Sequence, residues 1–253
     1  MNSQSPIGFF DSGIGGLSVL RAARQALPFE HCVYYGDTKN APYGVRPQQE
    51  ILRLARAGAQ RLMKEGVKAL VIACNTATGA ALGALQAELP IPVIGIQPAL
   101  EAAQALRKGG HILALATPAA LESARYKALR KRYGEGVIDL PAPGLMEFVE
   151  REELSGERLE NALRRLFSPC LDMPIDVIAL GCTHFPFLKA EIARFFPGVP
   201  MIDDSPRVCR ELSEALVEKN MLNPGPGAGS LRLYSSGGAQ AEERLRRLAL
   251  GGE

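Results

Sequence analysis

The chain has 253 residues, 47% of them hydrophobic, with 29 lysines and arginines against 27 aspartates and glutamates. This length can bury the core of one large domain or of two small ones, and the composition excludes disordered and fibrous proteins. The net charge of +2 is spread over interspersed basic and acidic residues, so we expect no nucleic-acid partner.

The apolar runs and the cysteines indicate where such a protein would act. Residues 1–6 are polar and lead into a short apolar run at 7–10, which does not fit a secretory signal. No apolar run is long enough to cross a bilayer. The five cysteines are widely spaced and match neither a disulfide framework nor a zinc-binding CxxC pair. We therefore expect a cytoplasmic protein with free thiols and no membrane contact.

Short apolar runs alternate with helical patterns along almost the whole chain. The runs predict strands at 7–10, 32–35, 70–73, 93–96, 112–116, 137–140, 177–180, 200–202 and 231–234. Helical patterns lie between them, among others at 47–65, 77–88, 118–133, 156–166 and 206–219. Strands that alternate with helices predict βαβ units, and hence an α/β fold with mainly parallel sheets.

Two segments of this pattern resemble each other. Residues 67–76 and 175–184 each contain an apolar strand, a small residue, a cysteine and then residues that can cap a helix. An internal duplication into two pseudo-symmetric α/β domains follows, with a cleft between them. The Gly- and Pro-rich stretch at 225–229 is expected to be a surface loop.

Two early segments place polar groups after predicted strands. The first strand ends at Asp11 and Ser12, and glycines then allow a tight turn into a helix. The segment has neither the third glycine of a dinucleotide fingerprint nor a Gly-Lys-Ser/Thr sequence. The second strand is followed by Asp37, which fits a turn or cap. Tyr43 and Gly44 then lie in a loop that can offer a phenol and backbone N–H groups to a ligand.

The two cysteines of the duplicated segments are the main candidates for chemistry. Cys74 and Cys182 both follow a predicted strand and precede a predicted helix, whose N-terminus would stabilise a thiolate. His184 can hydrogen-bond to such a thiolate or to a substrate carboxylate. Cys32, Cys170 and Cys209 lack polar followers at a strand end, so we interpret them as structural.

Two thiols on opposite walls of a cleft predict two-base proton transfer. One thiolate removes an α-proton from one face of a substrate, and the opposite thiol returns a proton to the other face. No lysine for a pyridoxal Schiff base is indicated, so N–H and hydroxyl donors would stabilise the carbanion without a cofactor.

Three other interpretations use the same residues. Zinc binding by Cys74, Cys182, His184 and Asp11 lacks the usual ligand spacing. Redox sensing through a Cys74–Cys182 disulfide gives no reason for the flanking polar residues. A ligand-binding module without catalysis would not need paired thiols.

Five ordered motifs resemble the glutamate racemase signature set. They occupy residues 10–17, 35–38, 41–44, 73–78 and 180–186, and residues 93–96 and 234–237 also resemble that pattern. The similarity runs from Ile7 to about Gly237. It implies two α/β lobes, residues 1–96 plus 208–253 and residues 97–207, with the active site in the cleft between them.

The resemblance also implies roles for individual residues. Cys74 would act on D-glutamate and Cys182 on L-glutamate, with Asp11 assisting the first thiol and His184 and Glu150 the second. The substrate-binding residues would be Asp11, Ser12, Tyr43, Gly44, Asn75, Thr76, Thr117, Thr183 and His184. No metal and no cofactor would be needed, the protein would be a homodimer, and its D-glutamate would supply peptidoglycan synthesis.

Some positions depart from the family pattern. Ala142 stands where relatives often carry cysteine, and Ala120 replaces a second threonine near Thr117. Glu147, Glu152 and Glu153 lie near Glu150, and all four also fit an exposed helix surface. Related aspartate racemases share the two-cysteine logic, and the first motif together with the Tyr43 loop favours glutamate.

Overall fold

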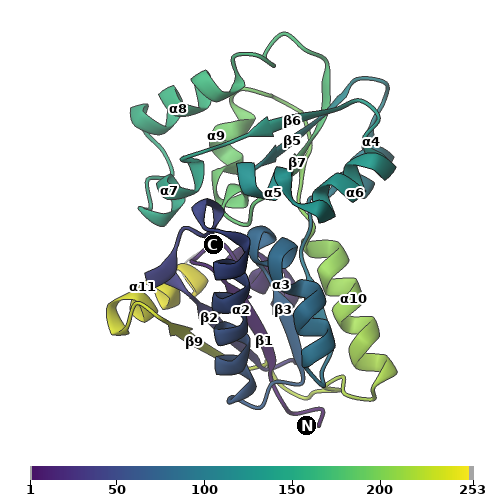
Figure 1. Cartoon of the computed structure of the whole chain (residues 1–253), viewed down its shortest axis with the longest axis vertical. Helices are drawn as coiled ribbons and strands as arrows, with labels where there is room; N and C mark the ends of the chain where they lie inside the picture. Colours follow the sequence, from purple (N-terminus) through teal and green to yellow (C-terminus); the bar gives the residue numbers. More distant parts are fainter. Residues whose placement is uncertain (1, 251–253) are drawn as a thin grey trace. The chain divides into compact units, whose positions relative to one another are not determined.

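The structure is a computed structural model that describes residues 2–250 (Figure 1). The chain divides into two compact units, of which the first runs to Ile96 and resumes at Ser205, and the second is Gln97–Asp204. The sequence analysis placed the second boundary between residues 207 and 208, whereas it lies at the start of helix α10 (Ser205–Glu218). Met1 and residues 251–253 of the predicted first lobe lie outside the described residues.

The first unit contains a five-stranded parallel sheet in the order β4-β3-β1-β2-β9. Its strands are β1 (Ile7–Asp11), β2 (Cys32–Gly36), β3 (Ala69–Ile72), β4 (Val93–Gly95) and β9 (Leu231–Ser235). Every residue of β1 and β3 is buried, which explains why these central strands read as unbroken apolar runs.

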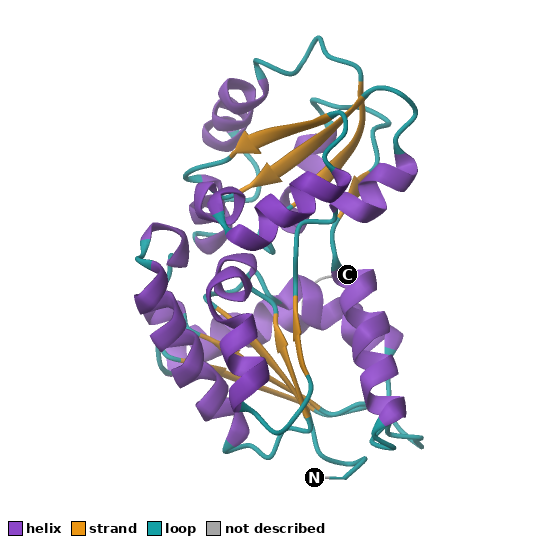
Figure 2. Ribbon diagram, turned by 45° about the vertical axis from the view of Figure 1, so that its right-hand side comes forward, coloured by secondary structure: helices purple, strands orange, loops and turns teal. Residues whose placement is uncertain are grey.

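Helices cover both faces of this sheet (Figure 2). On one face, α2 (Gln48–Met63) packs against α3 (Asn75–Glu88), and their apolar side chains form one core cluster with the strands. On the other face, α1 (Leu17–Ala26) packs against α10 and α11 (Ala239–Leu250). The helices leave the carboxyl edge of the sheet to its loops.

The second unit contains a four-stranded parallel sheet in the order β6-β5-β7-β8. Its strands are β5 (His111–Ala116), β6 (Val137–Pro141), β7 (Ile175–Leu180) and β8 (Met201–Ile202). Helices α4 (Leu100–Leu106) and α6 (Ala124–Tyr133) share a core cluster with β5 and β7. A second apolar group joins Phe167 of α8 (Glu157–Phe167) to Phe195 and Phe196.

The two sheets share one strand order. If β1 to β4 are aligned in sequence with β5 to β8, both sheets read fourth, third, first, second, and only the first sheet adds β9. This shared topology is what the internal duplication predicts. The predicted fold class, two α/β units with parallel sheets, is confirmed.

One predicted helix is wrong. Residues 118–133 form two helices, α5 (Pro118–Glu122) and α6, because Ser123 between them has an extended backbone. The Ser123 hydroxyl donates to the Ala120 carbonyl at 2.8 Å and accepts the Tyr126 N–H at 3.1 Å, so it ends one helix and caps the next. The helical ranges named from the sequence do not include α4, α7 (Leu145–Glu150) and α9 (Lys189–Ala193), among others. Within residues 2–250, no helix has the length and apolar character needed to cross a membrane.

Candidate active site

Each unit carries a cysteine at the topological switch point of its sheet. In the first unit the chain leaves β1 toward β2 on one side and returns to β3 on the other, so the connections diverge above β1 and β3. Ligands of open α/β sheets bind at such points, beyond the carboxyl ends of the strands. Asp11 ends β1 and Cys74 follows β3, and the backbone N–H of Ala73 donates to the Phe10 carbonyl at 2.8 Å. The fold therefore places Asp11 and Cys74 side by side.

Cys74 itself is the N-cap of helix α3, whereas the sequence pattern predicted that the residues after it would cap the helix. Its Sγ accepts the backbone N–H of Ala77 at 3.4 Å, and the Ser12 Oγ lies 3.4 Å from the same sulfur. The side chain is almost buried, at 6% exposure. A thiolate here would have the free N–H groups of a 14-residue helix as its counterpart.

Asp11 is fully buried beside this thiol. Its Oδ1 accepts the backbone N–H of Gly13 at 2.8 Å, which holds the turn between β1 and α1. A Cβ on Gly16 would lie 2.6 Å from the Cβ of Asp11 and 3.0 Å from that of Ala73. Glycine at position 16 is therefore required by the close approach of helix α1 to the two strand ends.

The Tyr43 loop is held by Asp37, a residue that the sequence analysis interpreted as a turn or cap. Asp37 follows β2, and its backbone N–H donates to the Asp11 carbonyl at 2.9 Å. The Tyr43 hydroxyl donates to the Asp37 Oδ2 at 2.7 Å, and Asn40 Nδ2 donates to the same carboxylate. Burial, and then the bond to Asp37, raise the pKa of Tyr43 far above its usual value, so its phenol stays protonated. Gly44 follows in the short helix η2 (Tyr43–Val45).

Asn75 has an unsatisfied amide beside the Cys74 thiol. Both polar atoms of its amide are buried, and neither has a hydrogen-bond partner among the described residues. A buried amide without a partner costs about 1–3 kcal/mol. Because Asn75 follows Cys74 directly and is flanked by the half-buried Thr76, a bound molecule beside the thiol would satisfy this amide. We call Asp11, Ser12, Asp37, Tyr43, Cys74 and Asn75 the Cys74 cluster.

The second unit repeats the switch point between β5 and β7. Thr117 follows β5 and Cys182 follows β7, and the N–H of Gly181 donates to the Leu115 carbonyl at 2.7 Å. Both side chains are nearly buried, as is Thr183. The Thr117 hydroxyl accepts the N–H of Ala120 at 3.3 Å and caps α5. Ala142, where relatives often carry cysteine, is buried just beyond the end of the neighbouring strand β6.

A histidine and a glutamate support Cys182. The Cys182 Sγ lies 3.5 Å from His184 Nδ1, and His184 Nε2 lies 2.8 Å from Glu150 Oε1. His184 is 2% exposed, so this chain of contacts is shielded from water. The structure thus joins three residues that the family resemblance grouped at the Cys182 side. We call Thr117, Glu150, Cys182, Thr183 and His184 the Cys182 cluster.

The expected helix after Cys182 is only partly present. Cys182 is followed by the four-residue 3-10 helix η3 (Phe185–Leu188) and then by the short α9, instead of starting an α-helix as Cys74 does. Pro186, which has no backbone N–H, lies in this first turn. The helix N-terminus inferred for Cys182 is therefore much weaker than that at Cys74, and His184 contacts the Cys182 sulfur.

The glutamates near Glu150 have different surroundings. Glu150 ends helix α7 and contacts His184, whereas Glu153 pairs with Arg151 and Arg158. Glu147, one turn before Glu150, has one buried carboxylate oxygen with no hydrogen-bond partner among the described residues. The exposed-surface interpretation therefore does not hold for Glu150 or Glu147.

The other cysteines are buried thiols, and the metal interpretation can be set against the grouping of the side chains. Each of the five cysteines is buried and free of disulfides. Burial raises the pKa of Cys32 to about 12, and it also raises the pKa of Cys170, so both favour the thiol form. Among residues 2–250, no three His, Cys, Asp or Glu side chains come together as a group that would hold a metal ion.

The chain is similar in sequence and in structure to known racemases. The model of the Asp/Glu/hydantoin racemase family matches residues 16–208. A glutamate racemase of Clostridium perfringens is 46% identical over 237 residues, which cover 92% of this chain and 91% of the relative. The structure of glutamate racemase from Thermus thermophilus in complex with β-chloro-D-alanine has a TM-score of 0.84 and 36% identity, with coverage of 100% of this chain and 95% of that one.

A glutamate racemase from Bacillus anthracis gives a TM-score of 0.89 at 33% identity, with coverage of 100% of this chain and 96% of that chain. Identity and coverage of this extent confirm the resemblance that the sequence motifs indicated. The chain belongs to the Asp/Glu/hydantoin racemase family of enzymes.

Proposed function

We propose that this enzyme interconverts L- and D-glutamate by two-base proton transfer between Cys74 and Cys182. With D-glutamate, the Cys74 thiolate takes the α-proton and becomes a thiol, while the Cys182 thiol gives its proton to the opposite face of the carbanion and becomes a thiolate. With L-glutamate the two thiols exchange roles. Each turnover conserves protons overall, so no oxidant, reductant or co-substrate is consumed.

The observation that carries this proposal is the matching placement of the two thiols. Both are nearly buried, and each follows the third strand of a sheet with the same strand order. A reaction that removes a proton from one face and adds one to the other needs two groups of the same kind. Because both must reach one α-carbon, we propose that the two clusters face a common substrate.

Different neighbours would activate the two thiols. At Cys74, the N-terminus of α3 and the Ser12 hydroxyl stabilise the thiolate, and the Asp11 carboxylate attracts the substrate's ammonium group. At Cys182, His184 exchanges or shares a proton with the sulfur, and Glu150 holds the imidazole in place. The family resemblance likewise assigns Asp11 to the Cys74 side, and His184 and Glu150 to the Cys182 side.

Donors around the clusters suit a substrate with two carboxylates. Asn75 offers an unpartnered buried amide, and Ser12, Thr76, Thr117 and Thr183 are hydroxyl residues of the two switch-point loops. Tyr43 and Gly44 would add a protonated phenol and a backbone N–H. The relatives named glutamate racemase, at up to 46% identity over most of the chain, favour glutamate over aspartate.

Three further expectations belong to this proposal. The D-glutamate would supply peptidoglycan synthesis, the enzyme would act in the cytoplasm as a homodimer, and it would need no cofactor. Each stays a prediction that follows from the family resemblance.

Circular dichroism of purified enzyme with D-glutamate, and then with L-glutamate, tests the proposal. The reactions contain EDTA and no added cofactor, and they are repeated with aspartate and with the Cys74→Ser and Cys182→Ser variants. We expect loss of optical activity from either glutamate enantiomer, and a fall in kcat of about a thousandfold in each variant because each removes an acid–base group. The Cys32→Ser variant is the matched control and should keep its activity.

Each other outcome changes a specific part of the proposal. Racemisation of aspartate in place of glutamate would change the substrate and keep the mechanism. Full activity in either of the two cysteine variants would overturn the two-base mechanism. Inhibition by EDTA would favour the metal interpretation instead.

A further inference from the structure

The Tyr-Ser-Ser-Gly sequence at residues 234–237 is part of the family-like pattern, yet none of its residues has a role in the proposed reaction. It connects β9 to helix α11 at the carboxyl edge of the first sheet. Strand β9 pairs with β2, and Ser235 lies opposite Gly36, the residue before Asp37. The sequence therefore reaches the sheet edge next to the loop that carries Tyr43 and Gly44.

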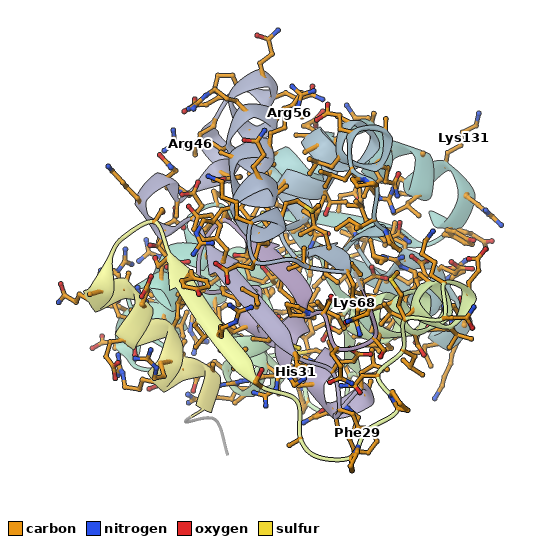
Figure 3. The ribbon with its side chains drawn as sticks, turned by 90° about the horizontal axis from the view of Figure 1, so that it is seen from below. Phe29, His31, Arg46, Arg56, Lys68 and Lys131 are labelled. Carbon is orange, nitrogen blue, oxygen red and sulfur yellow. The ribbon has the colours of Figure 1, made fainter. Side chains whose placement is uncertain are left out.

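This loop, residues 37–46, is held by contacts within itself and to helix α2, in addition to any contact with β9. On its inner side, the Tyr43 hydroxyl donates to the Asp37 carboxylate. On its outer side, Arg46 Nε donates to the Asn40 carbonyl at 2.8 Å, and the same guanidinium pairs with Glu50 of α2. Figure 3 labels Arg46, which lies beside helix α2. These contacts hold Asp37 and the second half of the loop, and they leave residues 38 and 39 to other groups.

The two serines hold that beginning. The Thr38 Oγ1 lies 2.6 Å from the Ser235 Oγ, and the backbone N–H of Lys39 donates to the Ser236 Oγ at 3.0 Å. The backbone N–H of Ser236 donates to the Gly36 carbonyl at 3.1 Å, which continues the pairing of β9 with β2. Two hydroxyls from the end of the chain thus fix residues 38 and 39.

The serines are themselves fixed by the start of α11. The N–H of Ser235 donates to Glu242 Oε1 at 3.2 Å, and the N–H of Gly237 donates to the Ser235 Oγ at 3.0 Å. A Cβ on Gly237 would lie 2.6 Å from the Thr38 Oγ1 and 2.9 Å from the Ala241 Cβ. Only glycine fits at position 237, because Thr38 and α11 leave no room for a side chain there.

We propose that Ser235 and Ser236 are positioning residues for the substrate-binding loop 37–46. They hold Thr38 and Lys39 in register with β9, so that Asp37 keeps its contact with Tyr43 and the loop keeps Tyr43 and Gly44 in place for the substrate. This inference rests on the proposed function, because it takes those two residues as substrate ligands. The segment 235–242 thereby acts on a binding loop almost 200 residues away in the sequence.

The kinetic signature of such a role differs from that of an acid or base. A loosened loop weakens the contacts of Tyr43 and Gly44 with the substrate in the ground state and the transition state alike, so KM rises while kcat changes little. Cys74 is held by α3 and Ser12, which do not contact the serines in any described hydrogen bond. Loss of one neutral hydrogen bond predicts a rise in KM of roughly fivefold for each serine variant.

The test compares Ser235→Ala and Ser236→Ala with Ser230→Ala. Ser230 lies just before the other end of β9, where its hydroxyl contacts His31 at 2.9 Å, far along the strand from the loop; His31 is labelled beside this strand in Figure 3. Kinetics with D-glutamate and thermal unfolding are measured for each variant. We expect KM to rise about fivefold in the first two variants, with kcat within about twofold of the wild type, and to stay unchanged in Ser230→Ala. Ser235→Thr, which keeps a hydroxyl, should restore KM.

Two further measurements separate positioning from a general loss of structure. Thr38→Val removes the partner hydroxyl, so the Thr38→Val/Ser235→Ala double variant should raise KM no more than either single variant does. Hydrogen exchange followed by mass spectrometry should show faster deuterium uptake in the peptide covering residues 37–46 of Ser236→Ala, because the Lys39 amide has lost its acceptor. The same peptide should be unchanged in Ser230→Ala.

The possible failures are distinguishable. A wild-type enzyme that leaves glutamate unchanged would overturn the proposed function. An active wild type whose Ser235→Ala and Ser236→Ala variants match Ser230→Ala in KM and in deuterium uptake would overturn this inference alone. A fall in kcat at unchanged KM would also overturn it, since that result would place the serines in the chemical step.

Discussion

Cys74 and Cys182 occupy equivalent positions in two sheets of the same strand order, but their surroundings differ. Cys74 starts an α-helix of 14 residues and contacts a serine hydroxyl. Cys182 precedes a four-residue 3-10 helix and contacts His184, which in turn contacts Glu150. The duplication has kept the position of the thiol, and the supporting groups have diverged.

This difference shows two ways to prepare the same chemical group. A helix N-terminus and a hydroxyl supply fixed dipoles whose strength does not depend on pH. An imidazole can change its charge near neutral pH, and it can also carry a proton to or from the sulfur. We therefore expect loss of the imidazole to affect the Cys182 side of the reaction, and loss of the serine hydroxyl to affect the Cys74 side.

Among the residues that support the thiols, the largest effect is expected from His184→Asn, which removes the ring nitrogen that faces Glu150 and leaves beside the sulfur an amide that cannot exchange a proton. Loss of a hydrogen bond to a charged group predicts a fall in kcat of about ten- to a hundredfold. The two enantiomers have equal free energies in water, so kcat/KM must fall equally in both directions. The affected thiol is instead revealed by α-deuterated substrates: the isotope effect should rise for L-glutamate, whose proton Cys182 would remove under the proposed mechanism, and fall for D-glutamate.

Glu150→Gln is the graded companion to this variant. The amide can still accept a hydrogen bond from His184 but no longer offers a negative charge, so the fall in kcat should be smaller and the shift in isotope effects should have the same direction. Glu153→Gln, which contacts two arginines on the surface, is the control and should leave both isotope effects unchanged. Equal isotope effects for both enantiomers in His184→Asn would contradict the division between the clusters.

Gly181→Ala tests how tightly the Cys182 cluster is packed. A Cβ there would lie 2.7 Å from the Ala116 Cβ and 3.2 Å from the Leu115 carbonyl oxygen, so β7 would have to move away from β5 and take Cys182 with it. We expect a loss of about 1–3 kcal/mol in the free energy of unfolding, measured by urea denaturation, together with a lower kcat. Gly83→Ala is the matched control: nothing lies within 4 Å of its added methyl group, and it should stabilise helix α3 by up to about 1 kcal/mol. Equal stability of the two variants would contradict the tight junction.

The strands of both sheets were predictable from sequence because parallel strands buried on both faces leave a simple mark. Runs such as residues 69–72 and 177–180 are apolar throughout, and the structure has strands at both places. The break in the helix predicted at 118–133 was not predictable in the same way. It depends on the Ser123 hydroxyl bonding both the Ala120 carbonyl and the Tyr126 N–H, and the helical pattern on either side is unbroken.

The residues of the candidate site also divide into those with a local sequence signal and those that depend on distant contacts. Cys74 and Cys182 were found because the duplication repeats a cysteine at a strand end, which is a local signal. Asp37 and Ser235 acquire their significance only from partners elsewhere: Asp37 from Tyr43, and Ser235 from Thr38, almost 200 residues earlier in the sequence. Glu150 could not be separated from its neighbouring glutamates until the turn of α7 placed it at His184.

Ser12→Ala addresses the Cys74 cluster with a smaller expected effect. The variant removes one neutral contact at 3.4 Å from the sulfur, and the helix N-terminus remains. We expect kcat to fall by roughly fivefold, with isotope effects that shift opposite to those of His184→Asn: up for α-deuterated D-glutamate and down for the L enantiomer. Ser18→Ala, at a hydroxyl within α1 that bonds the Gly15 carbonyl, is the control. A shift in the same direction as in His184→Asn would show that the two clusters do not act on opposite faces.

Cys32 extends the comparison to a thiol at the opposite, amino end of a strand. Burial is the largest cause of its raised pKa of about 12, against an ordinary value of 9.0. Below pH 9 the folded and unfolded chains both keep this proton, so Cys32 makes no pH-dependent contribution to stability there. Between pH 9 and about 12 the unfolded chain loses the proton and the folded chain keeps it, so stability falls as pH rises, by about 1 kcal/mol at pH 10.

In Cys32→Ala this part of the alkaline fall in stability should disappear, although the lost packing lowers stability at every pH. Urea denaturation from pH 8 to pH 10.5 measures how steeply the free energy of unfolding falls with pH in the wild type and in Cys32→Ala. Equal slopes for the wild type and Cys32→Ala would mean that the Cys32 thiol is not held in its protonated form, and position on the strand would then no longer distinguish it from Cys74 and Cys182.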